Sequence, residues 1–147
     1  DGCREQVFID SAGASNLEGR CFVTFGGLPP EKLTGKGLEF VERYKEKYGD
    51  VPEAYAVYGY EAACVAIEAI RRAGSKDRRA IADAALAIRD FKGALGNWGF
   101  DENGDTTMQT LTVSVVKNGR FEFEEILEAD RKNNALEADA DGGKSNQ

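Results

Sequence analysis

Apolar residues recur every three or four positions in three consecutive segments of the chain, which is the spacing of one face of an α-helix. The first predicted helix covers residues 35–48, and its apolar positions are Leu38, Val41, Tyr44 and Tyr48. The second covers residues 55–73, ends at Gly74, and carries the longest apolar stripe: Ala56, Tyr60, Ala63, Cys64, Ile67 and Ile70. Because this stripe runs the length of the helix, we expect the helix to be mostly buried. The third covers residues 76–88, with Ser75 as its N-cap and a narrower apolar face: Ile81, Ala84, Ala85 and Ile88.

β-structure is predicted on both sides of these helices. Before them, residues 20–25 form a compact β-prone run that follows a short helix at residues 5–9. After them, residues 111–116 and 120–126 flank Asn118-Gly119, a pair of residues that favours a two-residue hairpin turn. We expect a hairpin whose apolar side chains share one inward face: Leu111, Val113, Val115, Phe121, Phe123 and Ile126.

Two segments interrupt this regular pattern. Residues 26–30 (GGLPP) cannot continue a helix or strand, because glycine is conformationally permissive and proline lacks an amide donor. They predict a crossover or hinge. Residues 128–147 contain few apolar side chains and predict a disordered tail, since they cannot bury enough surface to offset their ordering entropy.

The composition indicates an acidic globular chain. It has 147 residues, 41% of them hydrophobic, with 26 acidic and 19 basic side chains and a net charge of −7. This length fits one ordinary domain, and the negative charge makes nucleic acid an unsuitable partner. No apolar run approaches the ~20 residues that span a bilayer. Because residues 1–3 (DGC) do not resemble a start or a signal peptide, we expect further sequence upstream.

The residues that most enzymes require are missing. The chain has no histidine, which is the commonest general base, triad partner and metal ligand. Residues 101–105 (DENGD) resemble the start of a calcium loop, but Thr106 and Thr112 stand where that loop needs glycine and a bidentate glutamate. No complete dinucleotide or phosphate-binding glycine motif occurs. The sequence therefore indicates no enzyme, metal or cofactor.

The three cysteines form no CxxC pair or zinc motif. Cys64 lies on the apolar stripe of the second helix and is expected in the core. Cys3 and Cys21 could form a disulfide if their segments lie side by side, or both could remain free thiols.

Several motifs, in their order and spacing, resemble one family of binding proteins. They are residues 28–32 (LPPEK), 40–49 (FVERYKEKYG), 52–63 (PEAYAVYGYEAA), 66–74 (AIEAIRRAG), 91–93 (FKG) and 100–105 (FDENGD), followed by the hairpin. Together they resemble the type I periplasmic substrate-binding proteins of the leucine/isoleucine/valine class over residues 1–127.

The resemblance implies an α/β fold with a partial two-lobe architecture. Members of this family have two lobes joined by three crossovers and close on a ligand held between them. Residues 1–27 and 92–127 would belong to one lobe, and residues 28–91 would supply helices to the other. Much of both parallel sheets would then lie outside this chain.

The same resemblance implies two ligand-binding residues. Asp1 stands where the family has an acidic residue that accepts hydrogen bonds from the ligand's ammonium group. Tyr55 stands at an aromatic position that lines the side-chain pocket. Asp1 could instead be a solvated terminal aspartate, and Tyr55 a core residue at the start of its helix. Tyr58 and Tyr60 are expected in the core. The ligand's carboxylate would be held by the half of the site that this chain lacks.

The function implied by the resemblance is solute binding, of an amino acid or a similar small molecule. The partner would be the permease of an ABC transporter, and the location periplasmic or extracellular. Two alternatives remain open: a structural fragment that binds no ligand and associates with itself, and a ligand-sensing receptor domain of the same fold. Self-association is expected because missing sheet partners would leave strand edges and apolar faces uncovered.

Overall fold

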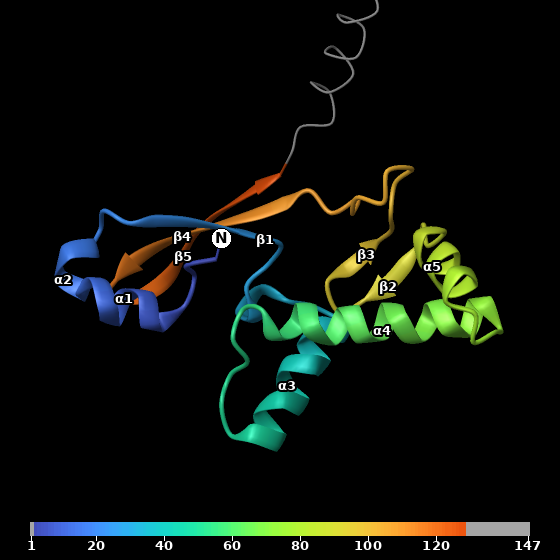
Figure 1. Cartoon of the computed structure of the whole chain (residues 1–147). Helices are drawn as coiled ribbons and strands as arrows, with labels where there is room; N and C mark the ends of the chain where they lie inside the picture. Colours follow the sequence, from blue (N-terminus) through green and yellow to red (C-terminus); the bar gives the residue numbers. More distant parts are fainter. Residues whose placement is uncertain (1, 129–147) are drawn as a thin grey trace, which may run out of the picture.

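The computed structural model describes residues 2–128, and the chain in it forms two regions (Figure 1). The elements of the first, the sheet region, are helices α1 (Gln6–Ala12) and α2 (Ala14–Leu17) and strands β1 (Phe22–Gly26), β4 (Thr110–Lys117) and β5 (Arg120–Glu128). The strands make an antiparallel sheet of order β1-β4-β5. The predicted order of a short helix followed by a strand is confirmed at the N-terminal end of this region.

The second, the helical region, lies between β1 and β4 in the sequence. Its elements are the 3-10 turn η1 (Pro30–Lys32), helices α3 (Lys36–Tyr48), α4 (Ala56–Ala73) and α5 (Arg78–Leu86), and strands β2 (Phe91–Gly93) and β3 (Gly96–Trp98). Strands β2 and β3 pair as a small antiparallel hairpin. The three consecutive helices are therefore confirmed, and the β2–β3 hairpin that follows them was not predicted. The predicted tail falls outside the described residues, apart from Glu128 at the end of β5.

The N-cap of α5 differs from the prediction. Asp77 caps the helix, because its carboxylate oxygen Oδ1 accepts a hydrogen bond from the amide of Ala80 at 2.8 Å. The hydroxyl of Ser75, the predicted cap, instead accepts from the amide of Asp77 at 3.0 Å. The helix starts two residues later than expected, since the side chain that reaches the third helical amide defines the cap.

The hairpin of β4 and β5 is confirmed, but its predicted single inward face is wrong. The two-residue turn at Asn118-Gly119, both with positive φ, pairs Lys117 with Arg120. Val115 therefore lies opposite Glu122, and the phenylalanines of β5 lie on the other face of the sheet. Side chains alternate along a strand, so the turn length decides which apolar sets share a face. The set of β5 (Phe121, Phe123 and Ile126) shares its face with Thr112, Ser114 and Val116, not with Leu111, Val113 and Val115.

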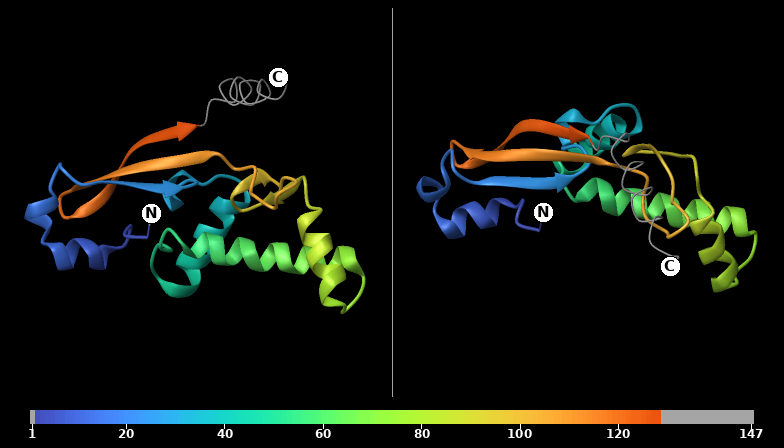
Figure 2. Two further views of the ribbon diagram at one scale, coloured as in Figure 1. Left: turned by 45° about the horizontal axis from the view of Figure 1, so that its top comes forward. Right: turned by 90° about the horizontal axis from the view of Figure 1, so that it is seen from above.

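A β-bulge keeps Phe121, Phe123 and Ile126 of β5 on one face of the sheet. The register shifts between Val113 and Ser114, which leaves Glu124 as the extra residue on β5. Without this shift, Ile126 would point away from Phe121 and Phe123. The ring of Phe8 in α1 stacks on that of Phe121, with 6.4 Å between the centroids. This face of the sheet is thus the one that α1 covers, and α4 begins on the same side (Figure 2).

Helix α4 is the centre of the helical region. It was predicted to be mostly buried, but only part of it is. Its buried residues are Val57, Glu61 and Ala69, and Val57 joins a small core cluster with Leu33, Val41 and Ala94. On the apolar stripe Ile67 is 67% exposed, Ile70 51% and Tyr60 42%. Ile67 and Ile70 lie uncovered, whereas Tyr60 contacts Phe40 of α3, with 4.9 Å between the ring centroids.

A buried carboxylate fastens the β2–β3 hairpin to α4. Glu61 is 2% exposed and accepts hydrogen bonds from the amides of Ala94 (2.8 Å) and Leu95 (3.3 Å) and from the indole nitrogen of Trp98 (2.7 Å). Three donors offset the cost of burying this carboxylate. The contact also requires glycine at position 93, since a Cβ atom there would collide with the carboxylate.

All three cysteines are free thiols, so of the two alternatives for Cys3 and Cys21 the structure shows unpaired residues and no disulfide. Cys64 is half-buried rather than in the core. None of the helices between residues 2 and 128 combines the length and apolar character needed to span a membrane.

Candidate ligand-binding site

Three aromatic rings meet where the end of β1 approaches the start of α4. The ring of Phe25 is 2% exposed and lies 5.2 Å from that of Tyr55 and 5.5 Å from that of Tyr58, centroid to centroid. Both contacts are edge-to-face, at interplanar angles of 72° and 88°. This geometry is favourable for aromatic pairs beyond the area they bury. We call Phe25, Tyr55 and Tyr58 the aromatic cluster.

Tyr58 attaches the cluster to the segment predicted as a crossover. Its hydroxyl donates a hydrogen bond to the carbonyl oxygen of Gly26. Burial raises the pKa of Tyr58 to about 12, so the hydroxyl keeps its proton at neutral pH. Gly27 has a φ of 89°, and a Cβ atom at this position would collide with the Tyr58 hydroxyl. Glycine is therefore required at position 27 both by the backbone conformation and by this close approach.

The other side of the crossover is held by β4. The amide of Gly27 donates to the carbonyl oxygen of Thr110 at 2.7 Å, and the hydroxyl of Thr112 donates to the carbonyl oxygen of Gly27 at 2.6 Å. The chain thus leaves the sheet region at a segment that is hydrogen-bonded to both β4 and α4. This arrangement fixes the position of Tyr55 relative to the sheet.

Charged groups surround the aromatic cluster. The guanidinium of Arg4 lies 5.4 Å from the centroid of the Phe25 ring, and its Nε donates to the hydroxyl of Ser114 at 3.1 Å. Partial burial, and then the nearby charge of Glu53, raise the pKa of Glu5 above its ordinary value. The cation of Arg4 therefore lies against the aromatic surface, and the carboxyl groups of Glu5 and Glu53, next to Arg4 and close to Tyr55 in the sequence, lie near each other. Such a combination can hold a small molecule that has an apolar body and charged ends.

The two predicted ligand residues have different outcomes. Asp1 lies outside the described residues. Tyr55 lies in the aromatic cluster and is half-buried at the start of α4. Of the two tyrosines expected in the core, Tyr58 is half-buried, whereas Tyr60 is 42% exposed and contacts only the ring of Phe40 among the aromatic side chains of the described residues.

Phe25 and Arg4 were not among the predicted site residues. Phe25 alternates with Val23 in the β-prone run, a pattern that is typical of an inward-facing residue but that does not identify Phe25 as a neighbour of Tyr55. No local pattern singles out Arg4. Within residues 2–128, no group of three or more His, Cys, Asp or Glu side chains is placed to hold a metal ion.

Comparison with protein families gives one match over most of the chain. The profile of the family described as "Periplasmic binding protein" matches residues 5–120. These residues include α1, α2, β1 and β4 of the sheet region, the whole helical region and the aromatic cluster, whereas β5 beyond Arg120 lies outside the match.

Individual relatives belong to the same class of binding protein. The chain is 34% identical over 121 residues to Leu/Ile/Val-binding protein homolog 7 of Brucella abortus (strain 2308), which covers 79% of this chain and 30% of the relative. It is 35% identical over 96 residues to homolog 1 from the same strain, covering 65% of this chain and 25% of the relative. The chain thus spans less than a third of the length of these curated relatives.

Solved structures agree with this. A leucine binding protein LivK from Thermotoga maritima superposes with a TM-score of 0.79 at 39% identity, over 88% of this chain and 36% of that one. The branched-chain amino acid transporter substrate binding protein LivJ from Streptococcus pneumoniae, solved in complex with isoleucine, has a TM-score of 0.71 at 23% identity. It covers 85% of this chain and 35% of that one, and at this identity it shows the fold alone.

Proposed function

Because the chain belongs to the periplasmic binding protein family, we propose that it supplies part of the amino acid site in the solute-binding component of an ABC transporter. The observation that carries this proposal is the aromatic cluster, which places Tyr55 beside Phe25 at the junction of the two regions. The relatives' names support a branched-chain amino acid as the ligand class. The proposed location is the periplasm.

In this proposal the chain provides one side of a cleft. The ring of Tyr55 is a wall for an apolar side chain, and Asp1 accepts hydrogen bonds from the ligand's ammonium group. The sheet region belongs to one lobe and the helical region to the other, together with the β2–β3 hairpin that Glu61 holds against α4, so the crossover at Gly26-Gly27 is one of the hinges. The remainder of a two-lobe protein holds the ligand's carboxylate.

The proposed role is to bind a solute and deliver it to a permease, without chemical change. The charged groups near the cluster suit this role. Arg4 and Glu5 flank an aromatic surface at which ionic ends and an apolar body could be held together. A site that is closed from both sides gains affinity by enclosing the ligand, so this chain alone should bind amino acids weakly.

A second candidate role is self-association. It is favoured by the exposed stripe on α4 and by an apolar groove of about 510 Å³ on the α4–α5 side, whose lining includes Val65, Ala69, Ile81, Ala85 and Met108. Exposed apolar surface of this kind is normally covered. A second copy of the chain is the proposed occupant in this role, and light scattering that shows a monomer would exclude it.

Calorimetric titration with leucine, isoleucine and valine tests the main proposal. The protein used is a two-lobe binding protein that carries this segment, in its native form and as Tyr55→Ala. Loss of an aromatic wall should weaken binding by about tenfold to a hundredfold.

The matched control is Tyr48→Ala, which removes a ring that is 61% exposed on α3 and outside the aromatic cluster. It should leave the affinity within about twofold. Equal affinities for the native protein and Tyr55→Ala would contradict the proposal.

A further inference from the structure

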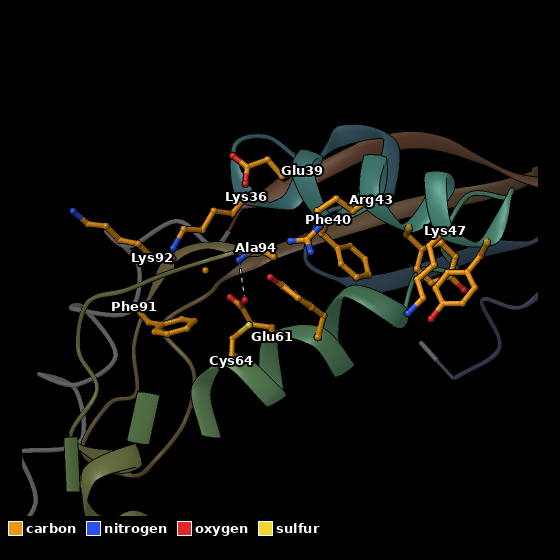
Figure 3. Close-up of a pocket in the computed structure, with 14 residues that line it drawn as sticks. Lys36, Glu39, Phe40, Arg43, Lys47, Glu61, Cys64, Phe91, Lys92 and Ala94 are labelled. Atoms are coloured by element: carbon orange, nitrogen blue, oxygen red, sulfur yellow. Dashed lines mark hydrogen bonds between the residues drawn. The ribbon is translucent and has the colours of Figure 1, made fainter. Parts of the chain in front are cut away.

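A second hollow lies away from the aromatic cluster, between α3 and α4, with the β2–β3 hairpin at its end (Figure 3). Its volume is about 430 Å³, which is in the range of small-molecule sites. None of the three cluster residues lines it. We call it the α3–α4 pocket.

Its walls are largely aromatic. Phe40 and Tyr44 come from α3 and Tyr60 from α4, and the ring of Phe40 lies 4.9 Å from that of Tyr60 and 5.9 Å from that of Tyr44. Phe91 of β2 lines the pocket at its hairpin end. Flat apolar walls of this kind suit a flat apolar ligand.

Positive charge dominates the pocket. The cationic side chains that line it are Lys36, Arg43, Lys47 and Lys92. Within residues 2–128 none of the four forms an ion pair. Only two carboxylates, of Glu39 and Glu61, line the same space. The pocket therefore has an excess of positive charge that no side chain of the described chain neutralises.

The hydrogen-bonding capacity of Glu61 is already used at the base of the pocket. Its two oxygens accept the three hydrogen bonds that hold the β2–β3 hairpin, all from neutral donors, so its negative charge remains, and the four cations against two carboxylates still leave the pocket net positive. The ammonium group of Lys36 donates to the carbonyl oxygen of Lys92 at 2.6 Å, which joins the rim of the pocket across its opening. Figure 3 shows Arg43 on the α3 side, facing the same space as Ala94 and Glu61. These contacts preorganise the base and rim, and preorganisation lowers the entropic cost of binding.

We propose that the α3–α4 pocket binds a small aromatic carboxylate. The ring packs against the paired rings of Phe40 and Tyr60, with Phe91 at the hairpin end, and the carboxylate accepts charge-assisted hydrogen bonds from Arg43 and a neighbouring lysine. An inorganic anion would leave the aromatic walls unused, and an uncharged ring would leave the cations unpaired. The inference is independent of the amino acid site proposed above, since the two share no residue.

Titration of the 147-residue chain with phenylacetate, followed by two-dimensional amide NMR, tests this inference. Phenylacetate should shift the resonances of α3, α4 and β2 to saturation. Phenylacetamide, which lacks the charge, and acetate, which lacks the ring, should each bind at least about tenfold more weakly. Equal binding of phenylacetate and phenylacetamide would overturn the proposal, and so would the absence of binding by phenylacetate.

Two variants distinguish binding in the pocket from nonspecific attraction to the positive charges of α3. Arg43→Gln should weaken phenylacetate binding at least about tenfold, whereas Lys45→Gln, on the same helix but outside the pocket, should change it less than about twofold. Lys47→Gln serves in place of Arg43→Gln if the latter loses its dispersed amide spectrum. An equal effect of the pocket variant and Lys45→Gln would refute the assignment.

Cys64 gives a second readout of position, because its thiol lines the pocket. Phenylacetate should slow alkylation of Cys64 by iodoacetamide and leave Cys3 and Cys21 unaffected as internal controls. An unchanged rate of Cys64 alkylation at saturating phenylacetate would place the ligand elsewhere and contradict the proposal. Failure of leucine binding at Tyr55 would leave this result unaffected.

Discussion

The sheet region and the helical region bury their central elements to different extents. In the sheet region, β4 lies between β1 and β5, and its residues 112–116 are all buried. In the helical region, α4 occupies the same central position, but Ile67 and Ile70 remain more than half exposed. Within residues 2–128 the centre of β4 is therefore covered on both faces of the sheet, whereas one side of α4 is not.

The difference arises from the number of apolar faces. The buried side of α4 carries Val57 and Ala69, and its exposed side carries Ile67 and Ile70. A helix that is apolar on two sides belongs in the interior of a larger fold. Because the relatives are more than three times as long as the matched segment, the second side of α4 has room for cover in such proteins.

The largest expected effect comes from the carboxylate that joins α4 to the hairpin. Glu61→Ala should lower the free energy of unfolding by about 3 kcal/mol, because it leaves the amide of Ala94 and the indole of Trp98 buried without a partner. Urea denaturation measures this change.

Glu68→Ala is the matched control, a carboxylate on the same helix whose partners are the surface arginines Arg71 and Arg72. It should cost much less than Glu61→Ala. If the two variants lost equal stability, the hairpin would not depend on the Glu61 contact.

Smaller changes in stability are expected from substitutions on the two sides of α4. Val57→Ala should destabilise the chain by about 2 kcal/mol, because Val57 is 1% exposed in the core cluster. Ile67→Ala should change stability by less than about 0.5 kcal/mol, because its side chain is 67% exposed. Thermal unfolding of both variants gives the comparison. A large loss from Ile67→Ala in the isolated chain would show that the stripe is covered in solution, as self-association requires.

The smallest expected effect depends on pH. Hydrogen bonds from Arg71 and then Arg72 lower the pKa of Glu68 from 4.5 to about 2. The folded state therefore favours the ionised carboxylate, and this stabilisation is present above pH 4.5 and is lost as the pH falls toward 2. The effect is small because the pair lies at the surface.

The urea midpoints of the native chain and of Glu68→Gln should therefore differ at pH 7 and converge at acid pH. A difference that is constant across this range would argue against the contribution of the ion pair. High salt should reduce the difference at pH 7.

Much of the local structure could be predicted from the residues alone. The three helices, the strand at residues 22–26 and the Asn118-Gly119 turn follow short-range rules of periodicity and backbone conformation. The face assignment of the hairpin failed for a definite reason. A two-residue turn pairs Lys117 with Arg120, which places Val115 and Phe121 on opposite faces, and the bulge at Glu124 then changes the phase of β5.

The candidate site was predictable only in part. The resemblance singled out Tyr55, whereas its contact with Phe25 depends on how the crossover returns the chain to α4. The α3–α4 pocket left no recognisable motif in the sequence. Its aromatic and cationic residues belong to three elements, and each of them is ordinary for an amphipathic surface when taken alone.

The sequence by itself determined the presence and order of the three helices, β1 and the β4–β5 hairpin, the hairpin turn and the family, because these depend on residues close together in the chain and on ordered motifs. Only the tertiary structure decided which side of α4 is buried, how Glu61 holds the hairpin, and which rings surround Tyr55. These features arise from contacts between segments distant in the sequence, and such contacts depend on the path of the whole chain rather than on the periodicity of any one segment.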